Sequence, residues 1–342
     1  MCGRIVVFFV ACCFSVTLSQ HVKVKLYTME VMKKEIEVSV DGNVRELIGK
    51  EYYDKMEVIT PKLSTLNKNF LSNIGISNIV LSSNNIIKLM PSSFETCPPM
   101  TQVNLTHNRI KIIPENIFTN TNISDLNLSF NEIDTIEEDA FSNMPLLINI
   151  DLRNNNIKNW NQNWFYKTPQ LSRLQFSNNK LQELPANAFQ NLIGEKKYGN
   201  IQMKLMLYFS YNDLKTVTLN AFDGLKEIDK LWLDHNHLTT FNEAIVDKIK
   251  INELRLDSNE INRLSGEWKK LLNIQIIDLD SNPFHCDFIN EMKKWCEINN
   301  KKVSLFYSDM NCRVDRIKGK MDDLKRTLEK LKNERTSTPK SA

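Results

Sequence analysis

Glycine and proline are scarce in this chain, whose 342 residues include only 9 Gly and 10 Pro. This scarcity argues against a many-turned β-sandwich, because tight turns draw heavily on both residues. An excess of one charge is also lacking, since 44 Lys and Arg face 41 Asp and Glu and the net charge is +3. A chain without a basic field is not expected to bind nucleic acid. Because 42% of its residues are hydrophobic, it must fold.

Long hydrophobic runs are absent as well. The apolar run Ile5–Val16 is too short for a membrane span, which needs about 20 residues. Arg4 precedes it, and the small residues Thr17 and Ser19 follow at the positions that signal peptidases favour. We therefore expect residues 1–19 to be a secretory signal peptide and the mature chain to be a secreted, extracellular protein without a membrane span.

Four cysteines remain once that segment is removed, namely Cys97, Cys286, Cys296 and Cys312. Three of them lie near the C-terminus, where an oxidising compartment favours a local disulfide over a metal site. Cys97 lies far from the others. It is expected either to be free or to bond a second chain, which leaves a dimer through Cys97 open.

One apolar pattern recurs through the middle of the chain, with the form apolar-x-x-apolar-x-apolar-x-x-Asn-x-apolar. It occurs nine times from Ile76 to Phe284 with a period of 23 or 24 residues, except where about nine extra residues lie within 190–204. A degenerate copy precedes these and has Pro61 in its Asn position. The Asn positions of the nine copies are Asn84, Asn108, Asn131, Asn155, Asn179, Asn212, Asn236, Asn259 and Asn282.

Each position in this pattern has a physical role. Alternating apolar residues such as Leu254 and Leu256 form a short strand with one buried face, while the residues between them face solvent. The Asn amide can pair with backbone groups that a buried turn would leave without partners. Returning segments such as Ile110–Phe118 supply a second apolar line that is bulkier than the strands, so the stack curves with its sheet inside.

This pattern resembles the leucine-rich repeat family over residues 53–312. The resemblance implies an α/β solenoid, a horseshoe with a parallel concave sheet of about ten repeats at 53–284. Residues 20–52 would cap its N-terminal end. There Glu35–Val40, followed by Asp41 and Gly42, predicts a strand that pairs with the edge of the first repeat.

The C-terminal end matches the family's cysteine cap at residues 285–316, through Asn282, Pro283, Cys286, Trp295 and Cys312. The resemblance implies a disulfide between Cys286 and Cys312, worth about 3 kcal/mol by loop entropy. The family's usual second cysteine position holds Phe288. Cys296 is then expected to be a buried free thiol.

Beyond the cap, Ile317, Met321, Leu324, Leu328 and Leu331 follow a heptad spacing and predict an amphipathic helix at 317–334. Two interpretations are open. The favoured one is a cap helix that lies on the last repeat, and the other is a helix for self-association or for a partner. Residues 335–342 are expected to be disordered.

Motifs for catalysis are not found: there is no Gly-rich phosphate loop, no nucleophile elbow and no paired-Cys zinc motif. We therefore expect no enzyme activity, no cofactor and no metal. The neighbours Asp234, His235, Asn236 and His237 are best explained by chance placement around a repeat Asn.

An acidic column is expected where Asp234, Asp257 and Asp280 occupy the same position in successive repeats, with Asp278 beside them. Three interpretations are open: a small polar residue that is common beside the repeat Asn, an acidic strip for a basic partner, and, least favoured, a Ca²⁺ site.

N-glycosylation acceptors occur at Asn104, Asn122 and Asn127. Glycans there would occupy the concave face of the N-terminal half and direct a protein ligand to the C-terminal half. In that half the solvent-facing positions hold Tyr208, Tyr211, Trp232 and Arg255, residue types that dominate interface energetics. We predict a partner-binding surface made of these four and of Asp234, Asp257, Asp278 and Asp280. Alternatively, Tyr208 and Tyr211 pack against the insertion at 190–204.

The whole arrangement is similar to the arthropod, mosquito-type leucine-rich immune proteins. That resemblance implies a secreted, non-enzymatic protein-binding role in innate immune recognition or as an adaptor. A secreted inhibitor that wraps an enzyme or toxin, and an extracellular matrix or cell-adhesion component, are the alternatives.

Overall fold

The structure is a computed structural model that describes residues 21–60, 63–99, 101–192, 196–198 and 201–336. The expected signal peptide at 1–19 lies outside these ranges. So does the expected disordered tail, except for residues 335 and 336, which belong to a helix and correct that boundary.

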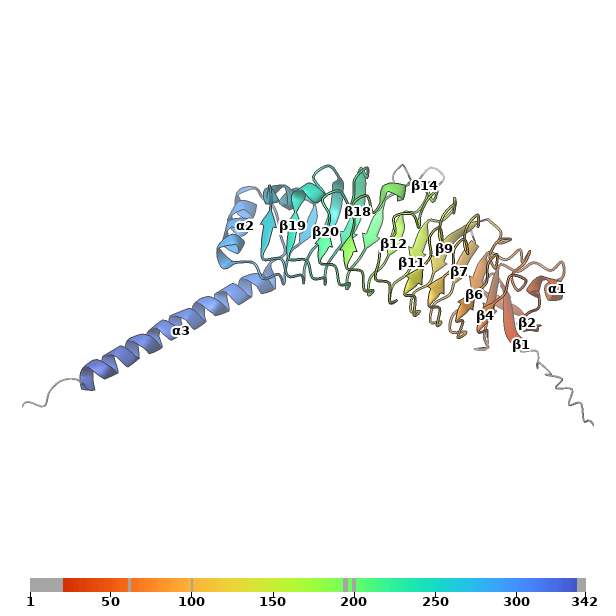
Figure 1. The fold of residues 1–342 in the computed structure, drawn as a ribbon, viewed down its shortest axis with the longest axis horizontal. Helices are drawn as coiled ribbons and strands as arrows, with labels where there is room; N and C mark the ends of the chain where they lie inside the picture. The colour runs from red at the N-terminus through yellow and green to blue at the C-terminus, as the bar shows by residue number, and fades with distance from the viewer. Residues whose placement is uncertain (1–20, 61–62, 100, 193–195, 199–200, 337–342) are drawn as a thin grey trace, which may run out of the picture.

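One twelve-stranded sheet runs along the whole curved body (Figure 1). Its ten strands from β3 onward are parallel and follow the repeats in order, whereas β1 and β2 add antiparallel at the N-terminal edge. In spatial order the strands are β2 (Val31–Ser39), β1 (His21–Thr28), β3 (Lys55–Val58), β5 (Asn78–Val80), β7 (Thr101–Asn104), β9 (Ile123–Asn127), β11 (Asn149–Asp151), β12 (Arg173–Gln175), β16 (Met206–Tyr208), β18 (Glu227–Trp232), β20 (Lys250–Arg255) and β22 (Ile276–Asp278).

The returning segments carry short parallel pairs and 3₁₀ turns. The pairs are β4 (Thr65–Leu66) with β6 (Lys88–Leu89), β8 (Ile112–Ile113) with β10 (Thr135–Ile136), β13 (Glu183–Leu184) with β17 (Thr216–Val217), and β19 (Thr240–Asn242) with β21 (Arg263–Ser265). The 3₁₀ turns are η1 (Gln190–Leu192), η2 (Glu243–Ile245) and η3 (Trp268–Asn273). The extra residues of the sixth repeat form a hairpin of β14 (Lys196–Tyr198) and β15 (Ile201–Met203). In the described part of the chain, α-helices occur only at the two ends: α1 (Val44–Ile48), α2 (Cys286–Ile298) and α3 (Phe306–Thr336).

The register of the strands confirms the predicted division into inner and outer residues. Leu231 pairs with Leu254, and both side chains are fully buried. The next pair is Trp232 with Arg255, and both of these remain partly exposed. Because side chains alternate across a strand, the same register puts every outer residue of the repeats on one face, which we call the sheet face.

The repeat asparagines form a buried hydrogen-bond ladder along the solenoid. The Asn131 amide donates to the carbonyl oxygens of Leu128 in its own turn and of Leu105 in the preceding repeat, each at 3.0 Å. Its Oδ1 accepts the N–H of Ile110 at 3.1 Å. Each Asn therefore ties its turn to the repeat before it. The same pattern recurs at Asn108, Asn155, Asn179, Asn212, Asn236, Asn259 and Asn282.

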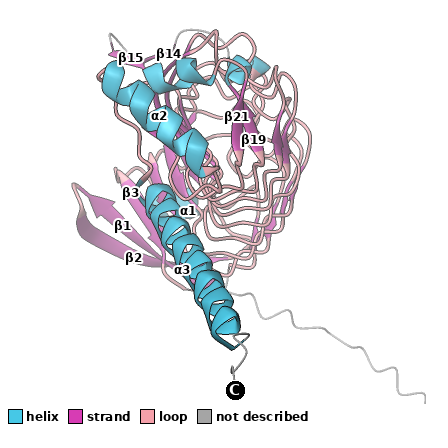
Figure 2. Ribbon diagram, turned by 90° about the vertical axis from the view of Figure 1, so that its left-hand side faces the viewer, coloured by secondary structure: helices cyan, strands magenta, loops and turns pink. Residues whose placement is uncertain are grey.

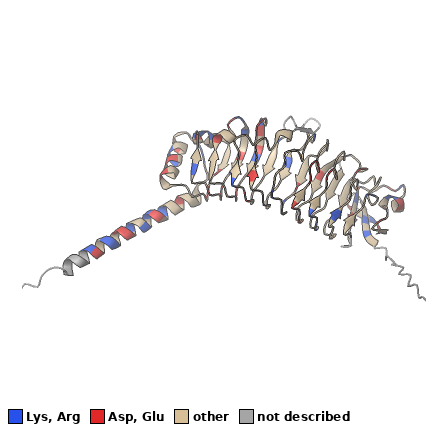
Figure 3. Cartoon of the chain, in the orientation of Figure 1, with Lys and Arg blue, Asp and Glu red and all other residues tan. Residues whose placement is uncertain are grey.

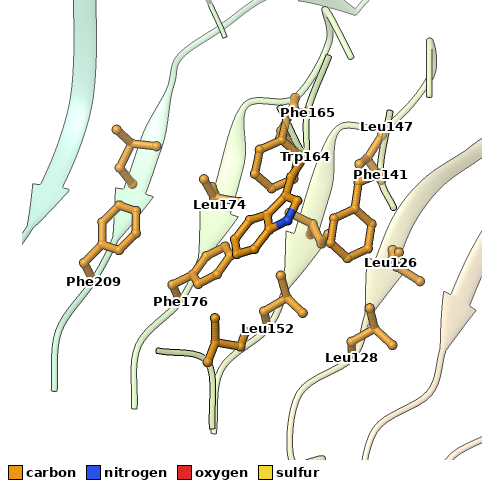
Figure 4. Close-up of a cluster of buried hydrophobic side chains, with 14 of the residues drawn as sticks. Leu126, Leu128, Phe141, Leu147, Leu152, Trp164, Phe165, Leu174, Phe176 and Phe209 are labelled. Atoms are coloured by element: carbon orange, nitrogen blue, oxygen red, sulfur yellow. The ribbon is translucent and has the colours of Figure 1, made fainter. Parts of the chain in front are cut away.

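A stack of phenylalanines fills the space behind the sheet. Neighbouring ring centroids lie 5.8 Å apart between Phe118 and Phe141 and again between Phe141 and Phe165. Figure 4 shows Trp164 among these rings, beside Phe176. The Trp164 indole N–H donates to the carbonyl of Ile136 at 3.2 Å, so its one polar group is satisfied inside the core.

The N-terminal cap differs from the expectation. β1, not the segment at Glu35–Val40, pairs with the first repeat strand β3, and β2 lies outside β1. The reason is burial, because β1 alternates three fully buried residues, Val22, Val24 and Leu26, with polar ones. In β2 only Val38 is fully buried, so β2 suits the exposed edge.

The C-terminal cap contains the expected disulfide between Cys286 and Cys312, with a Cα–Cα distance of 5.5 Å. It joins α2 to α3. Figure 2 looks onto the C-terminal end of the solenoid and shows α2 against it, and the buried residues Ile289, Met292 and Cys296 of α2 close the core there.

The two remaining cysteines are free and buried. Burial raises the pKa of the Cys97 thiol to about 12, and only 3% of the residue is exposed. Of the two alternatives for Cys97, the free thiol is the one that the structure has, whereas an intermolecular bond conflicts with the folded state, because disulfide formation requires both a thiolate and access.

Helix α3 does not lie on the last repeat, so the favoured interpretation of the 317–334 segment is wrong. It extends away from the body as one helix that begins inside the region assigned to the cysteine cap (Figure 1). Ile317, Met321, Leu324 and Leu328 are between 54% and 63% exposed. Among the described helices, none combines the length and apolar character that a bilayer crossing requires.

The Asn ladder predicts unequal costs for two substitutions. Asn131→Ala removes one of the two amide donors from each of the Leu105 and Leu128 carbonyls and leaves the buried N–H of Ile110 without its partner, so it should lower the free energy of unfolding by about 3 kcal/mol. Asn84→Ala should cost clearly less, because none of the described residues donates a hydrogen bond to the Oδ1 of Asn84. Urea denaturation of the two variants would measure the difference, and equal losses would contradict the ladder.

Candidate functional site

Four predicted site residues lie side by side on the sheet face. Tyr208 in β16, Trp232 in β18, Arg255 in β20 and Asp278 in β22 are successive register partners. The Tyr208 ring meets the Trp232 ring edge-on, with centroids 4.7 Å apart. The Arg255 guanidinium lies 4.1 Å from the Trp232 centroid, a cation–π contact. We call Tyr208, Trp232 and Arg255 the aromatic rung.

A buried carboxylate holds the aromatic rung in place. Glu253 is only 6% exposed and accepts hydrogen bonds from the Trp232 indole at 3.0 Å and from Arg255 Nε at 2.8 Å. Lys230 Nζ lies 3.2 Å from its other oxygen. The sequence analysis missed Glu253, although its position two residues before Arg255 puts it on the same face of β20.

Tyr211 lies beside the aromatic rung but in the turn that follows the strand. It is 50% exposed and its ring stacks on His235 at 4.0 Å. The hydrogen bond of Tyr208 runs to Met206 within its own strand, at 3.3 Å. The interactions of both tyrosines thus run along the sheet face.

The residues of the predicted acidic column have different environments: Asp234 and Asp280 are buried, whereas Asp257 and Asp278 are partly exposed. Asp280 is buried and accepts the backbone N–H groups of Tyr307 and Ser308 at 3.1 and 3.0 Å, in the first turn of α3. Burial alone would raise the pKa of Asp280, but these bonds and the one from Ser281 outweigh it and lower that pKa. Asp280 therefore anchors the start of α3, and its carboxylate is engaged within the chain.

Asp234 is also buried and is engaged within the chain. Its carboxylate accepts the Ser210 hydroxyl at 2.6 Å and lies 3.0 Å from His235 Nδ1. Ligand atoms of Asp234, His235 and Asp257 fall within 4.8 Å of one another. Within this group Asp234 and His235 bond each other.

Asp257 is the member of the acidic column whose ionisation is least favourable. Burial, and after it the negative charges of Asp278 and Asp234, together raise the pKa of Asp257 to about 6. Above this pH the carboxylate ionises beside two others. A cation placed opposite Asp257 and Asp278 would relieve that repulsion.

The N-terminal half of the sheet face holds a polar hollow of about 420 Å³. The acceptors Asn104 and Asn127 line it as register partners on β7 and β9. Asn122 instead lies directly before β9, where its amide donates to the Cys97 carbonyl at 3.3 Å. Glycans on Asn104 and Asn127 would fill the hollow, and their presence remains a prediction.

The opposite pKa shifts of Asp257 and Asp280 predict opposite effects of Asp→Asn substitution on the stability of the fold. Because the pKa of Asp257 is higher in the folded state than in the unfolded state, its ionisation lowers stability as pH rises from about 4 to about 6. Asp257→Asn should therefore raise the unfolding midpoint at pH 7, and the gain should vanish below about pH 4.

Asp280→Asn is the matched control. The lowered pKa of Asp280 stabilises the fold above the ordinary Asp pKa, so this substitution should lower the midpoint at pH 7 and matter less as pH falls through the folded-state pKa. Thermal unfolding at several pH values would measure both, and the same sign at pH 7 for the two variants would contradict this assignment.

Comparison with known proteins agrees with the geometry. Residues 64–196 and 143–273 match the model of the BspA type leucine rich repeat region. Bovine (Bos taurus) osteomodulin is 30% identical over 122 residues, which is 34% of this chain and 26% of osteomodulin. The chain thus spans about a quarter of the length of that relative.

Two solved structures are also similar to this chain. A chain of the Drosophila Toll–Spatzle complex is 20% identical and superposes with a TM-score of 0.54 over 64% of this chain and 29% of that one. The APL1 leucine-rich repeat domain is 16% identical, with a TM-score of 0.37 over 68% of this chain and 81% of that one. The repeats, the Asn ladder and the matching family model together show that this chain belongs to the leucine-rich repeat family.

Proposed function

We propose that this chain is an exported, non-enzymatic binding protein that recognises a protein ligand through the C-terminal half of its sheet face. The observation that carries the proposal is the aromatic rung: a Trp that contacts a Tyr and an Arg, all three half-buried and open to solvent on one face. These are the residue types that concentrate binding energy at protein interfaces.

The contacts of Glu253 support this assignment. A side chain that is already held in one conformation loses less entropy when it binds, so a preorganised surface gains affinity. Glu253 fixes both the Trp232 indole and the Arg255 guanidinium before any ligand arrives. A structural role alone would not require these two groups to stay at the surface.

The charges beside the rung specify the ligand further. Asp257 and Asp278 lie at its C-terminal side, and burial together with the negative charge of Asp278 raises the pKa of Asp257. A basic group on the ligand would relieve this repulsion and bind there. We therefore propose a ligand surface with an apolar or aromatic contact for Trp232 and a Lys or Arg for the two carboxylates.

The proposed role is recognition or adaptor work in innate immunity. The signal peptide expected at residues 1–19 and the disulfide of the cap support export. A chain from the Toll–Spatzle complex, described as a molecular hub in Drosophila development and innate immunity, shares the fold. The immune part of the proposal rests on this likeness of fold.

Affinity capture from the host's extracellular fluid tests the binding surface. The triple variant Tyr208→Ala, Trp232→Ala, Arg255→Ala should lose the partners that the wild type retains, because it removes the rung and leaves the buried strand residues untouched. The matched control is Asn149→Ala, Arg173→Ala, Gln175→Ala, which changes the lining of the N-terminal hollow. The control should retain the partners.

Equal recovery by all three proteins would remove the rung as the binding site. Loss by the control variant alone would move the site to the hollow. The unfolding midpoints of the three proteins should be measured in parallel. They distinguish a folding defect from a loss of binding.

A further inference from the structure

A pocket lies at the edge of the solenoid where the returning segments enter the strands. It has a volume of about 300 Å³ and is formed by η2 and the residues that follow it, by the start of β20 and by the end of η3. Lys250, the first residue of β20, lines this pocket, whereas Arg255, the last residue of the same strand, belongs to the aromatic rung. At about 3.3 Å per residue these two positions are about 17 Å apart along the strand. We call this separate site the edge pocket.

One wall of the edge pocket holds a buried carboxylate. Glu243, the first residue of η2, is only 8% exposed, and its Oε2 is buried without a hydrogen bond from any described residue. The carboxylate packs directly against the backbone of Gly266, where a Cβ would collide with Oε2. Burying a carboxylate without a partner is costly, so a group that enters the pocket and pairs with it gains binding energy.

The cations that line the edge pocket are engaged elsewhere. Lys250 Nζ donates to Glu227 Oε1 at 3.0 Å, and Lys270 Nζ lies 3.1 Å from an oxygen of Asp247. Figure 3 shows acidic and basic residues interspersed over this half of the solenoid, and each of these two lysines has a carboxylate of its own. Within the described part of the chain, no Lys or Arg forms an ion pair with Glu243. The charge of Glu243 is therefore open to a cation from outside.

The rest of the wall is largely aliphatic. Its side chains are those of Val246, Ile249, Ile251, Leu271 and Ile274. A ligand that fills the pocket would bury apolar surface against them and pair with the carboxylate at the same time. A mostly apolar wall with a few fixed polar groups is typical of small-molecule sites, and about 300 Å³ is the lower end of their range. The occupant is therefore small.

This set of groups favours an organic cation over other ligands. Ca²⁺ takes about six to eight oxygen ligands, and the other carboxylate of the wall, Asp247, is engaged by Lys270. An anion would face the charge of Glu243 at short range. A neutral apolar ligand would remove water from the carboxylate without replacing its hydrogen bonds. A protonated amine supplies both the charge and the N–H donors that the carboxylate lacks.

We propose that the edge pocket binds a small organic amine, with the ammonium group on Glu243 and the apolar body against the aliphatic wall. The site shares no residue with the aromatic rung or with Glu253, so it does not rest on the function proposed above. The chain thereby carries a small-molecule site at one end of β20 in addition to the protein-binding surface at the other.

Ligand-observed NMR titration of the full chain tests the preference for charge. The probes are phenethylammonium, its neutral counterpart phenethyl alcohol and the anion hydrocinnamate, which are similar in size and differ in charge. The wild type should bind the ammonium about tenfold or more tightly than the alcohol, because a hydrogen bond between charged groups is stronger than one to a neutral hydroxyl. The anion should bind most weakly.

Substitutions of Glu243 test its role. Glu243→Gln keeps the shape of the side chain and should weaken ammonium binding about tenfold or more while leaving alcohol binding unchanged. Glu243→Asp keeps the charge and should retain the preference for the ammonium. The matched control is Glu260→Gln, which makes the same change of charge at an exposed side chain outside the pocket and should bind as the wild type does.

Thermal unfolding of the same variants separates binding from folding. Glu243→Gln should unfold at the wild-type midpoint or above it, because it removes a buried charge that has no partner among the described residues. Equal binding of ammonium and alcohol by the wild type would overturn the proposal. An ammonium preference that survives in Glu243→Gln, or that is lost in Glu260→Gln, would overturn it as well.

A last probe, Nα-acetyl-lysine methylamide, distinguishes a free amine from a Lys side chain of a protein. Tighter binding of this probe than of phenethylammonium would overturn the assignment to a small molecule. The variant Tyr208→Ala, Trp232→Ala, Arg255→Ala should bind phenethylammonium as the wild type does, so failure of this proposal is distinguishable from failure of the proposed protein-binding function.

Discussion

The structure depends on the buried amide of the repeat asparagine. Every turn of the solenoid brings backbone carbonyls and N–H groups into a place that water does not reach, and each Asn side chain satisfies groups of its own turn and of the turn before. Apolar packing supplies most of the attraction between repeats but is tolerant of small shifts. The amide contacts are directional, so they fix each turn against its neighbour and hold the strands in one register. Only in that register do the residues of the aromatic rung lie side by side.

The register explains why so much of the fold could be predicted. Inner positions such as Leu231 and outer positions such as Trp232 follow from a pattern that repeats locally, and each copy reinforces the assignment of the others. The Cys286–Cys312 bond could be predicted in the same way, from the resemblance of the cap. The placement of Tyr208, Trp232 and Arg255 in one row follows directly from the repeat spacing.

The predictions that were wrong or incomplete concern contacts between segments that the repeat does not relate. The sequence shows two alternating segments before the first repeat, and it does not indicate which of them takes the edge of β3. The anchoring role of Asp280 depends on the start of α3, 27 residues further along the chain. Glu253 was missed because a charged residue in an outer position is unremarkable until the indole and guanidinium that share it are placed around it.

The two ends of the solenoid are closed by unequal means. A covalent bond and buried helix residues close the C-terminal end. At the other end a two-stranded hairpin covers the core, and the side-chain oxygen of Asn84, in the first repeat, receives no hydrogen bond from the part of the chain that the structure describes. Local unfolding should therefore begin at the N-terminal cap and spread along the repeats toward the C-terminal end. The aromatic rung and α3 would then belong to the part of the molecule that unfolds last.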